Sequence, residues 1–171
     1  FIAFLDCDDI WLPEKLDNQI NIMDFDSEII VCYSDGFYMY GLRKSKKMIS
    51  SSKNVRFYEG EIFDYLIILN FINWQTVLIN RKQAGANLYF NEELTYAEDY
   101  EILLRLSLIG KIKFIPRALI YYRFHETNMS HNYKLILKET ETIYKQFEKE
   151  IMDRKININK ARALIYGSVI V

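Results

Sequence analysis

Three aspartates stand directly after the first apolar stretch of the chain. Residues 1–5 are all apolar and have the length of a buried strand, and Asp6, Cys7, Asp8 and Asp9 follow at once. In an extended chain, residues i and i+2 point to the same side, so the side chains of Asp6 and Asp8 project together. Carboxylate oxygens are the ligands that Mg²⁺ and Mn²⁺ prefer, and these ions commonly bind substrate phosphate oxygens as well. The spacing therefore indicates a site for a divalent cation and a diphosphate, although Asp8 or Asp9 could instead cap the helix that follows.

A second acidic pair, Glu98 and Asp99, opens a segment with helical periodicity. Apolar residues at positions 102, 103, 106 and 109 give this helix one apolar face, and Gly110 is expected to cap its end. Acidic side chains in a first helical turn are favoured by the helix dipole. Thr95 and Glu98 also have the spacing of a capping box, in which the Glu98 side chain bonds to the Thr95 amide. That pattern predicts a structural role for Glu98 and gives none to Asp99.

The elements that must position these acids alternate between strands and helices, which predicts an α/β fold. The basic and serine-rich residues 41–54 have loop composition. The expected elements, in chain order, are a strand at 1–5, a helix at 13–23, strands at 29–33 and 37–40, a helix at 58–70, a strand at 76–79, the helix that opens at 98, strands at 113–115 and 118–122 broken at Pro116, and helices after 131.

The composition excludes several classes of protein. The chain has 171 residues, half of them apolar, with only 6 Gly and 2 Pro, so we expect one packed domain rather than a disordered or collagen-like segment. A net charge of -1 gives no general attraction to nucleic acid. Cys7 and Cys32 lack the spacing of a zinc site and are too few for a disulfide scaffold, which favours a reducing compartment such as the cytoplasm.

Four segments carry motifs in a characteristic order: FIAFLDCDDIWLPEKL at 1–16, QTVLINR at 75–81, AEDYEILLRL at 97–106 and YRFHETNMS at 122–130. Together they resemble the family 2 glycosyltransferases of the GT-A fold. The resemblance covers residues 1–131 and implies the second half of a GT-A domain, an α/β fold with a mixed sheet. The family's opening strands have no counterpart here, so we expect them upstream of Phe1. Residues 132–171 are expected to form a helical C-terminal extension.

The resemblance implies an inverting transfer of a sugar from a nucleotide diphosphate donor, assisted by Mn²⁺ or Mg²⁺, in glycan or polysaccharide biosynthesis. By it, Asp8 and Asp6 hold the metal, and Asp6 also lies near the ribose or diphosphate. His125 completes the metal site or contacts the diphosphate. Asp99 corresponds to the general base that takes the proton of the acceptor hydroxyl. Arg123 either neutralises donor phosphate charge or pairs with a nearby acid.

On the acceptor side, the resemblance places Trp74 beside the acceptor cleft, where the indole stacks on a sugar or packs in the core. Glu98 is assigned to the same side. The acceptor is a glycan, a lipid-linked compound or another hydroxyl compound. The basic residues 43–47 could touch anionic lipid headgroups at the inner face of the membrane, or form a solvated loop. Peripheral membrane association and oligomerisation therefore stay open.

Two other functions compete with the transferase. An Asp-x-Asp motif after an apolar strand also opens haloacid-dehalogenase-type phosphatases, but Ile10 stands where these have Thr or Val, and no later Gly-Asp-x-x-x-Asp motif follows. The second alternative is a non-catalytic carbohydrate-binding module derived from the GT-A fold. Titration with nucleoside diphosphates and Mn²⁺, set against a phosphatase assay, separates these alternatives.

Overall fold

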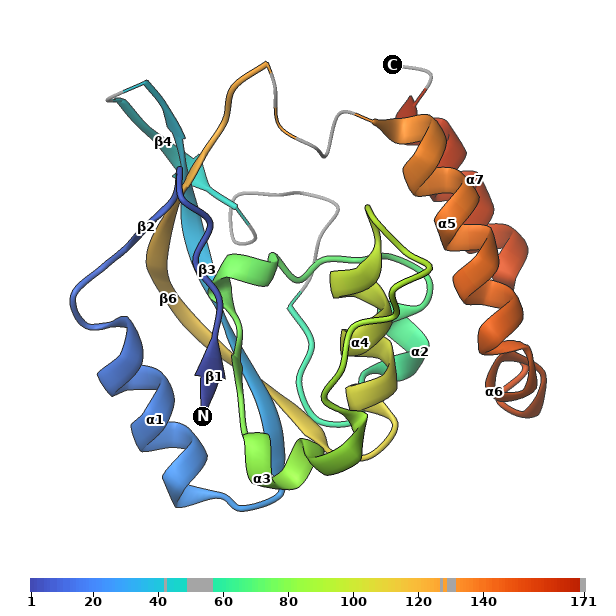
Figure 1. Ribbon diagram of the computed structural model, residues 1–171, viewed down its shortest axis with the longest axis horizontal. Helices are drawn as coiled ribbons and strands as arrows, with labels where there is room; N and C mark the ends of the chain where they lie inside the picture. The colour runs from blue at the N-terminus through green and yellow to red at the C-terminus, as the bar shows by residue number, and fades with distance from the viewer. Residues whose placement is uncertain (42, 49–56, 127, 129–131, 170–171) are drawn as a thin grey trace.

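A six-stranded mixed sheet forms the centre of the molecule (Figure 1). The computed structural model describes residues 1–41, 43–48, 57–126, 128 and 132–169. The strands are, in order across the sheet, β1 (Ile2–Ala3), β5 (Leu78–Ile79), β3 (Ile29–Tyr40), β6 (Lys111–Arg123) and β2 (Ile10–Trp11), with β4 (Arg43–Lys47) paired to β3. The prediction of an α/β fold with a mixed sheet is confirmed, because β3 and β6 run parallel and the other pairs run antiparallel.

The two long strands, β3 and β6, are the frame on which the short strands depend. Each was expected as two shorter strands, and both expectations are wrong. β3 continues through Ser34, Asp35 and Gly36, which are buried. β6 continues past Pro116 because its register against β3 shifts there, from Ser34 opposite Ile115 to Asp35 opposite Ala118. Proline has no N–H to offer a neighbouring strand, so an irregularity in the ladder is where it is tolerated.

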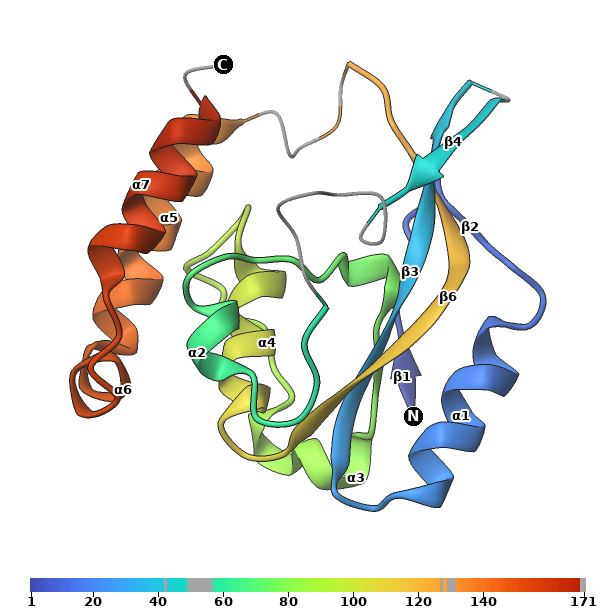
Figure 2. The ribbon, with the colours of Figure 1, turned by 180° about the vertical axis from the view of Figure 1, so that it is seen from behind.

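Helices cover the sheet on both sides (Figure 2). The helix α1 (Lys15–Phe25) packs over a small cluster that joins Met23 to Ile29, Cys32, Leu78, Ile115 and Leu119. The larger core lies on the other side, under α2 (Phe63–Leu66) and α4 (Glu98–Ser107). Short turns, η1 (Trp74–Thr76), α3 (Arg81–Ala84) and η2 (Gly85–Asn87), connect these elements.

The helices α5 (Tyr133–Gln146), α6 (Glu148–Asp153) and α7 (Ile158–Val169) form an outer layer beside α2 and α4 (Figures 1 and 2). Their buried side chains, among them Ile143, Phe147 and Ala161, belong to the same core as those of α2 and α4. The rings of Phe147 and Phe63 meet edge to face with centroids 5.6 Å apart. The predicted helices after residue 131 are confirmed, and their apolar face is continuous with the main core. No helix in the described part of the chain is long and apolar enough to cross a membrane.

Four further expectations are corrected. The first strand is two residues long and lies at the sheet edge, where β5 is its neighbour; Phe1 and Leu5 are each 50% exposed. The helix expected at 58–70 is the short α2. Residues 43–47, expected in a loop, form β4, while 49–54 of that loop lie outside the described residues. Gly110 is not a left-handed cap: a Cβ there would lie 2.8 Å from Ile30, so it permits close packing against β3.

Candidate active site

One cavity of about 910 Å³ gathers the predicted site residues at the end of the sheet. The acidic turn after β1, the connector before β5, the segment that leads into α4 and the end of β6 all line it. Side chains of α5 and α7 complete its wall. Of the predicted residues, the cavity wall includes Asp6, Asp8, Trp74, Glu98, Asp99 and His125. Residues far apart in the sequence are therefore brought to one place.

The three aspartates form a compact cluster at this wall. One carboxylate oxygen from each of Asp6, Asp8 and Asp9 lies within 4.8 Å of the others. The turn is fixed by its backbone, because the Asp6 amide donates to Gln75 Oε1 at 2.9 Å and the Asp9 amide donates to the Asp6 carbonyl at 3.2 Å. Asp6 and Asp8 face the cavity, whereas Asp9 is buried.

The position of Asp9 disfavours the ionised form of its carboxyl group. Its Oδ1 accepts from the Arg123 amide at 2.8 Å, but its Oδ2 is buried with no hydrogen-bond partner among the described residues. Burial, with a smaller contribution from the charges of Asp8 and Asp6, raises the pKa of Asp9 to about 6. A cation at this cluster would offset both the repulsion and the lost hydration.

The donors suit a hard divalent cation. All three clustered side chains offer carboxylate oxygen, the ligand type of Mg²⁺ and Mn²⁺, and the unsatisfied oxygen of Asp9 leaves the set short of positive charge. Asp6 and Asp8 reach the cavity, so a bound ion could also meet a phosphate there. The residues present therefore fit such an ion.

His125 and Arg123 lie beside the aspartates at the end of β6. His125 Nε2 is 2.7 Å from Asp8 Oδ2, and this hydrogen bond is the main reason that the pKa of Asp8 is lowered. The Arg123 guanidinium donates to the backbone carbonyls of Asp8, at 2.8 Å, and Gly41, at 3.0 Å. Arg123 is not among the residues that line the cavity. These contacts show it holding the backbone of the acidic turn.

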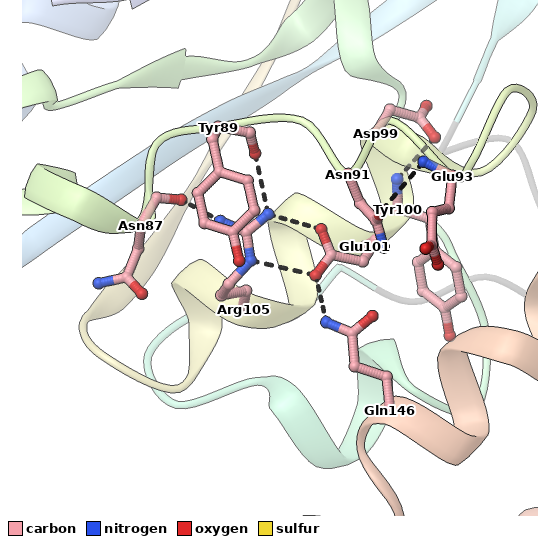
Figure 3. Close-up of polar contacts among 9 residues, drawn as sticks. All are labelled: Asn87, Tyr89, Asn91, Glu93, Asp99, Tyr100, Glu101, Arg105 and Gln146. Atoms are coloured by element: carbon pink, nitrogen blue, oxygen red, sulfur yellow. Dashed lines mark hydrogen bonds and ion pairs between the residues drawn. The ribbon is translucent and has the colours of Figure 1, made fainter.

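Across the cavity, α4 begins with Glu98 and Asp99. Asp99 Oδ1 accepts from the Tyr100 amide at 2.6 Å, as Figure 3 shows. Burial, followed by the charge of Glu98, raises the pKa of Asp99 to about 7. Burial also raises the pKa of Glu98, whose Oε2 has no hydrogen-bond partner among the described residues. The pair thus presents two acids that are reluctant to ionise together.

The expected capping box is wrong. The Thr95 amide donates to the carboxylate of Glu139, at 3.0 and 3.1 Å, and not to Glu98. The amides of Tyr96 and Ala97 donate to the same carboxylate at 2.7 and 2.9 Å. Glu139 lies on α5, so no local pattern around α4 could have revealed it.

Trp74 packs against other aromatic rings and also forms part of the cavity wall. Its ring lies 4.3 Å from the ring of Phe4, tilted by 31°, and meets Phe90 edge to face at 5.8 Å. It also lines the cavity. The indole is therefore a packed, rigid piece of the cavity wall, available to an apolar or sugar face on its open side.

A buried ion pair within α4 is a second feature that sequence reasoning missed (Figure 3). Glu101 and Arg105 lie one helical turn apart and meet at 2.5 and 3.0 Å. Arg105 also donates to the carbonyls of Asn87 and Tyr89, and Gln146 of α5 donates to Glu101 at 2.6 Å. Two charged residues at i and i+4 among buried positions were the available signal. The pair ties α4 to the loop that contains Asn87 and Tyr89, and to α5.

Comparison with known proteins finds distant relatives that are named glycosyltransferases. No family model matches the chain. An uncharacterised glycosyltransferase of Rickettsia typhi is 24% identical over 163 residues, which are 91% of this chain and 49% of that protein. A glycosyltransferase of Rickettsia prowazekii is 25% identical, and the match covers 88% of this chain and 48% of that protein. A glycosyltransferase of Methanocaldococcus jannaschii is also 25% identical, and the match covers 72% of this chain and 41% of that protein.

The chain is a distant relative of proteins named glycosyltransferase. It spans about half the length of the Rickettsia relatives.

Removing the charge of Glu101 should lower the stability of the folded protein. Glu101→Gln leaves the buried guanidinium of Arg105 without its counter-charge, which should reduce the free energy of unfolding by about 3 to 5 kcal/mol. Glu28→Gln is the control, because it breaks the exposed Glu28–Lys111 pair and should leave the stability close to that of the parent. Urea denaturation measures both. If both variants lost the same free energy of unfolding, the buried pair would contribute no more to stability than the exposed pair.

Asp99 should destabilise the folded protein at alkaline pH. Its pKa of about 7 lies above the value of about 3.9 in an unfolded chain, so the native state binds more protons between these values and loses stability as the pH rises through this window. Asp99→Asn removes that dependence and should be more stable than the parent at pH 8, by about 1 kcal/mol or more. The difference should vanish near pH 4. A variant that is less stable than the parent at pH 8 would contradict the assignment; Asp24→Asn, at an exposed position, controls for lost charge.

Proposed function

We propose that this chain carries the metal and acceptor sides of an inverting GT-A glycosyltransferase, which moves a sugar from a nucleotide diphosphate donor to a hydroxyl acceptor. The observation that carries the proposal is the meeting of two kinds of carboxylate on one cavity. Asp6 and Asp8 belong to a cluster suited to a cation, and Asp99, beside Glu98 at the start of α4, is an acid with a raised pKa. Metal-assisted departure of a diphosphate and proton removal from an acceptor need these two functions.

On the donor side, Asp8 and Asp6 would bind Mn²⁺ or Mg²⁺, with Asp9 supplying further negative charge behind them. When bound, the ion would offset the charge that develops on the departing diphosphate. His125 orients the Asp8 carboxylate through their 2.7 Å contact and lies where it can reach a phosphate oxygen. Arg123 fixes the backbone of the turn, so it acts on the donor through Asp8 and Asp9.

On the acceptor side, Asp99 would accept the proton of the attacking hydroxyl. A general base is most effective when its pKa is close to the working pH, and a pKa of about 7 meets that condition. Glu98 keeps negative charge next to Asp99 and so helps to hold the pKa of Asp99 up. The Trp74 ring, braced by Phe4 and Phe90, would support one face of the acceptor.

Asp8→Asn should weaken the metal-dependent binding of a nucleoside diphosphate, the product of the donor. The change removes a negative oxygen from the proposed cation site while keeping the side-chain size. Isothermal titration of the full-length protein with Mn²⁺ and a panel of nucleoside diphosphates should show affinity at least about 10-fold weaker than in the parent, a loss of 1.4 kcal/mol. Asp17→Asn, at an exposed position on α1, should bind like the parent. Equal binding by Asp8→Asn would contradict the metal role.

Asp99→Asn should separate chemistry from binding. Asparagine keeps the size and can hydrogen-bond but cannot accept the proton, so kcat should fall about 10²-fold or more while donor affinity stays within about 2-fold. Initial rates of sugar transfer and the same titration give the two values. Asp64→Asn, in an exposed pair with Arg154, should leave both unchanged. An Asp99→Asn enzyme with the parent rate would remove Asp99 from the mechanism.

A further inference from the structure

A glutamate of the C-terminal helices holds the segment that delivers Asp99. The carboxylate of Glu139 accepts hydrogen bonds from the amides of Thr95, Tyr96 and Ala97, at distances between 2.7 and 3.1 Å. These three residues stand immediately before α4, which starts at Glu98. Successive amides that converge on one anion form a nest, and hydrogen bonds to a charged acceptor are stronger than neutral ones.

The helix that carries Glu139 is itself firmly docked. Ile143 and Tyr144 of α5 are buried in the main core, and so is Phe147, which follows the helix directly. Gln146 lies seven residues after Glu139, on the same face of the helix, and donates to Glu101 at 2.6 Å. Before the helix, Asn132 donates to the Tyr96 hydroxyl at 3.1 Å. The helix α5 therefore contacts the segment just before α4 through Glu139, and contacts the first turn of α4 through Gln146.

The same helix takes part in the site. Ile136 and Thr140 of α5, and Ile165 of α7, line the cavity together with the acidic residues. Glu139 itself is not among the lining residues. Its hydrogen bonds therefore act on the site through the backbone that it holds, and its charge contributes to the raised pKa of Glu98.

We propose that Glu139 is a positioning residue for the transfer reaction: by binding the three amides ahead of α4, it sets where the Asp99 carboxylate stands in the cavity. This rests on the proposed function, in which Asp99 is the base. A base is effective only when its oxygen meets the acceptor hydroxyl at hydrogen-bond distance, and a shift of about 1 Å can lower a rate by about 10²-fold. The C-terminal helices are, on this view, part of the catalytic apparatus.

Three variants of the full-length protein test the proposal. Glu139→Ala removes the acceptor, Glu139→Gln keeps one accepting oxygen, and Glu141→Gln weakens the neighbouring α5–α7 pair with Arg162, whose hydrogen bonds are 2.8 and 2.7 Å. We expect kcat to fall about 10- to 100-fold in Glu139→Ala with the donor KM within about 2-fold, an intermediate value in Glu139→Gln, and the parent rate in Glu141→Gln. A parent-like kcat in Glu139→Ala, or an equal loss in Glu141→Gln, would overturn the proposal.

A second measurement needs no substrate. Amide hydrogen exchange of peptides that cover residues 95–99 should be faster in Glu139→Ala than in the parent and in Glu141→Gln, because three protected amides lose their acceptor. Unchanged exchange would overturn the proposal whatever the kinetics. The parent could also transfer no sugar from any nucleotide sugar while the amides of residues 95–99 still exchange faster in Glu139→Ala. In that case the proposed function fails, but the hydrogen bonds from Glu139 to the segment before α4 are confirmed. The two failures are therefore distinguishable.

Discussion

Crowding of negative charge around one cavity is the constraint on which the rest of this structure depends. Asp6, Asp8, Glu98 and Asp99 line the cavity, and Asp9 lies buried beside them. Burial, with a smaller contribution from neighbouring negative charges, raises the pKa of Asp9 to about 6 and that of Asp99 to about 7. Such an arrangement lowers stability and is typical of functional sites, where perturbed acids do chemical work. At the strand end a cation would relieve the crowding, and on α4 burial and the charge of Glu98 bring the pKa of Asp99 close to neutral pH, as the proposed role of Asp99 as the base requires.

The cavity keeps its shape because charged groups are fixed from outside it. Arg123 holds the backbone of the acidic turn, Glu101 and Arg105 join α4 to the loop at Asn87 and Tyr89, and Glu139 holds the segment before α4. Each of these contacts spans elements that are distant in sequence. The C-terminal helices are thus both part of the core and part of the site, since α5 supplies Glu139, Gln146 and two cavity-lining side chains.

The sequence predicted the elements well where one periodicity dominated and poorly where tertiary packing decided. The amphipathic patterns of α1, α4 and the C-terminal helices, and the Asp6–Asp8 spacing, are local and were readable. The continuity of β3 through Ser34 to Gly36, and of β6 past Pro116, depends on the neighbouring strand and was missed. The capping box failed for the same reason: Glu139, 44 residues after Thr95, competes for its amide. Residues from all four motif segments line one cavity, although Arg123 does not, and the order of the segments could not reveal which side chains hold them in place.

The stereochemistry of the transferred sugar tests the central claim most directly. Direct attack by a hydroxyl that Asp99 deprotonates inverts the anomeric centre, because the acceptor must approach opposite the departing diphosphate. The full-length protein should be incubated with Mn²⁺, an acceptor and the α-linked nucleotide sugar that supports transfer, and the anomeric proton coupling of the product should be measured by NMR. The account predicts a β-linked product. An α-linked product would contradict it, because retention requires a mechanism in which Asp99 is not simply the base.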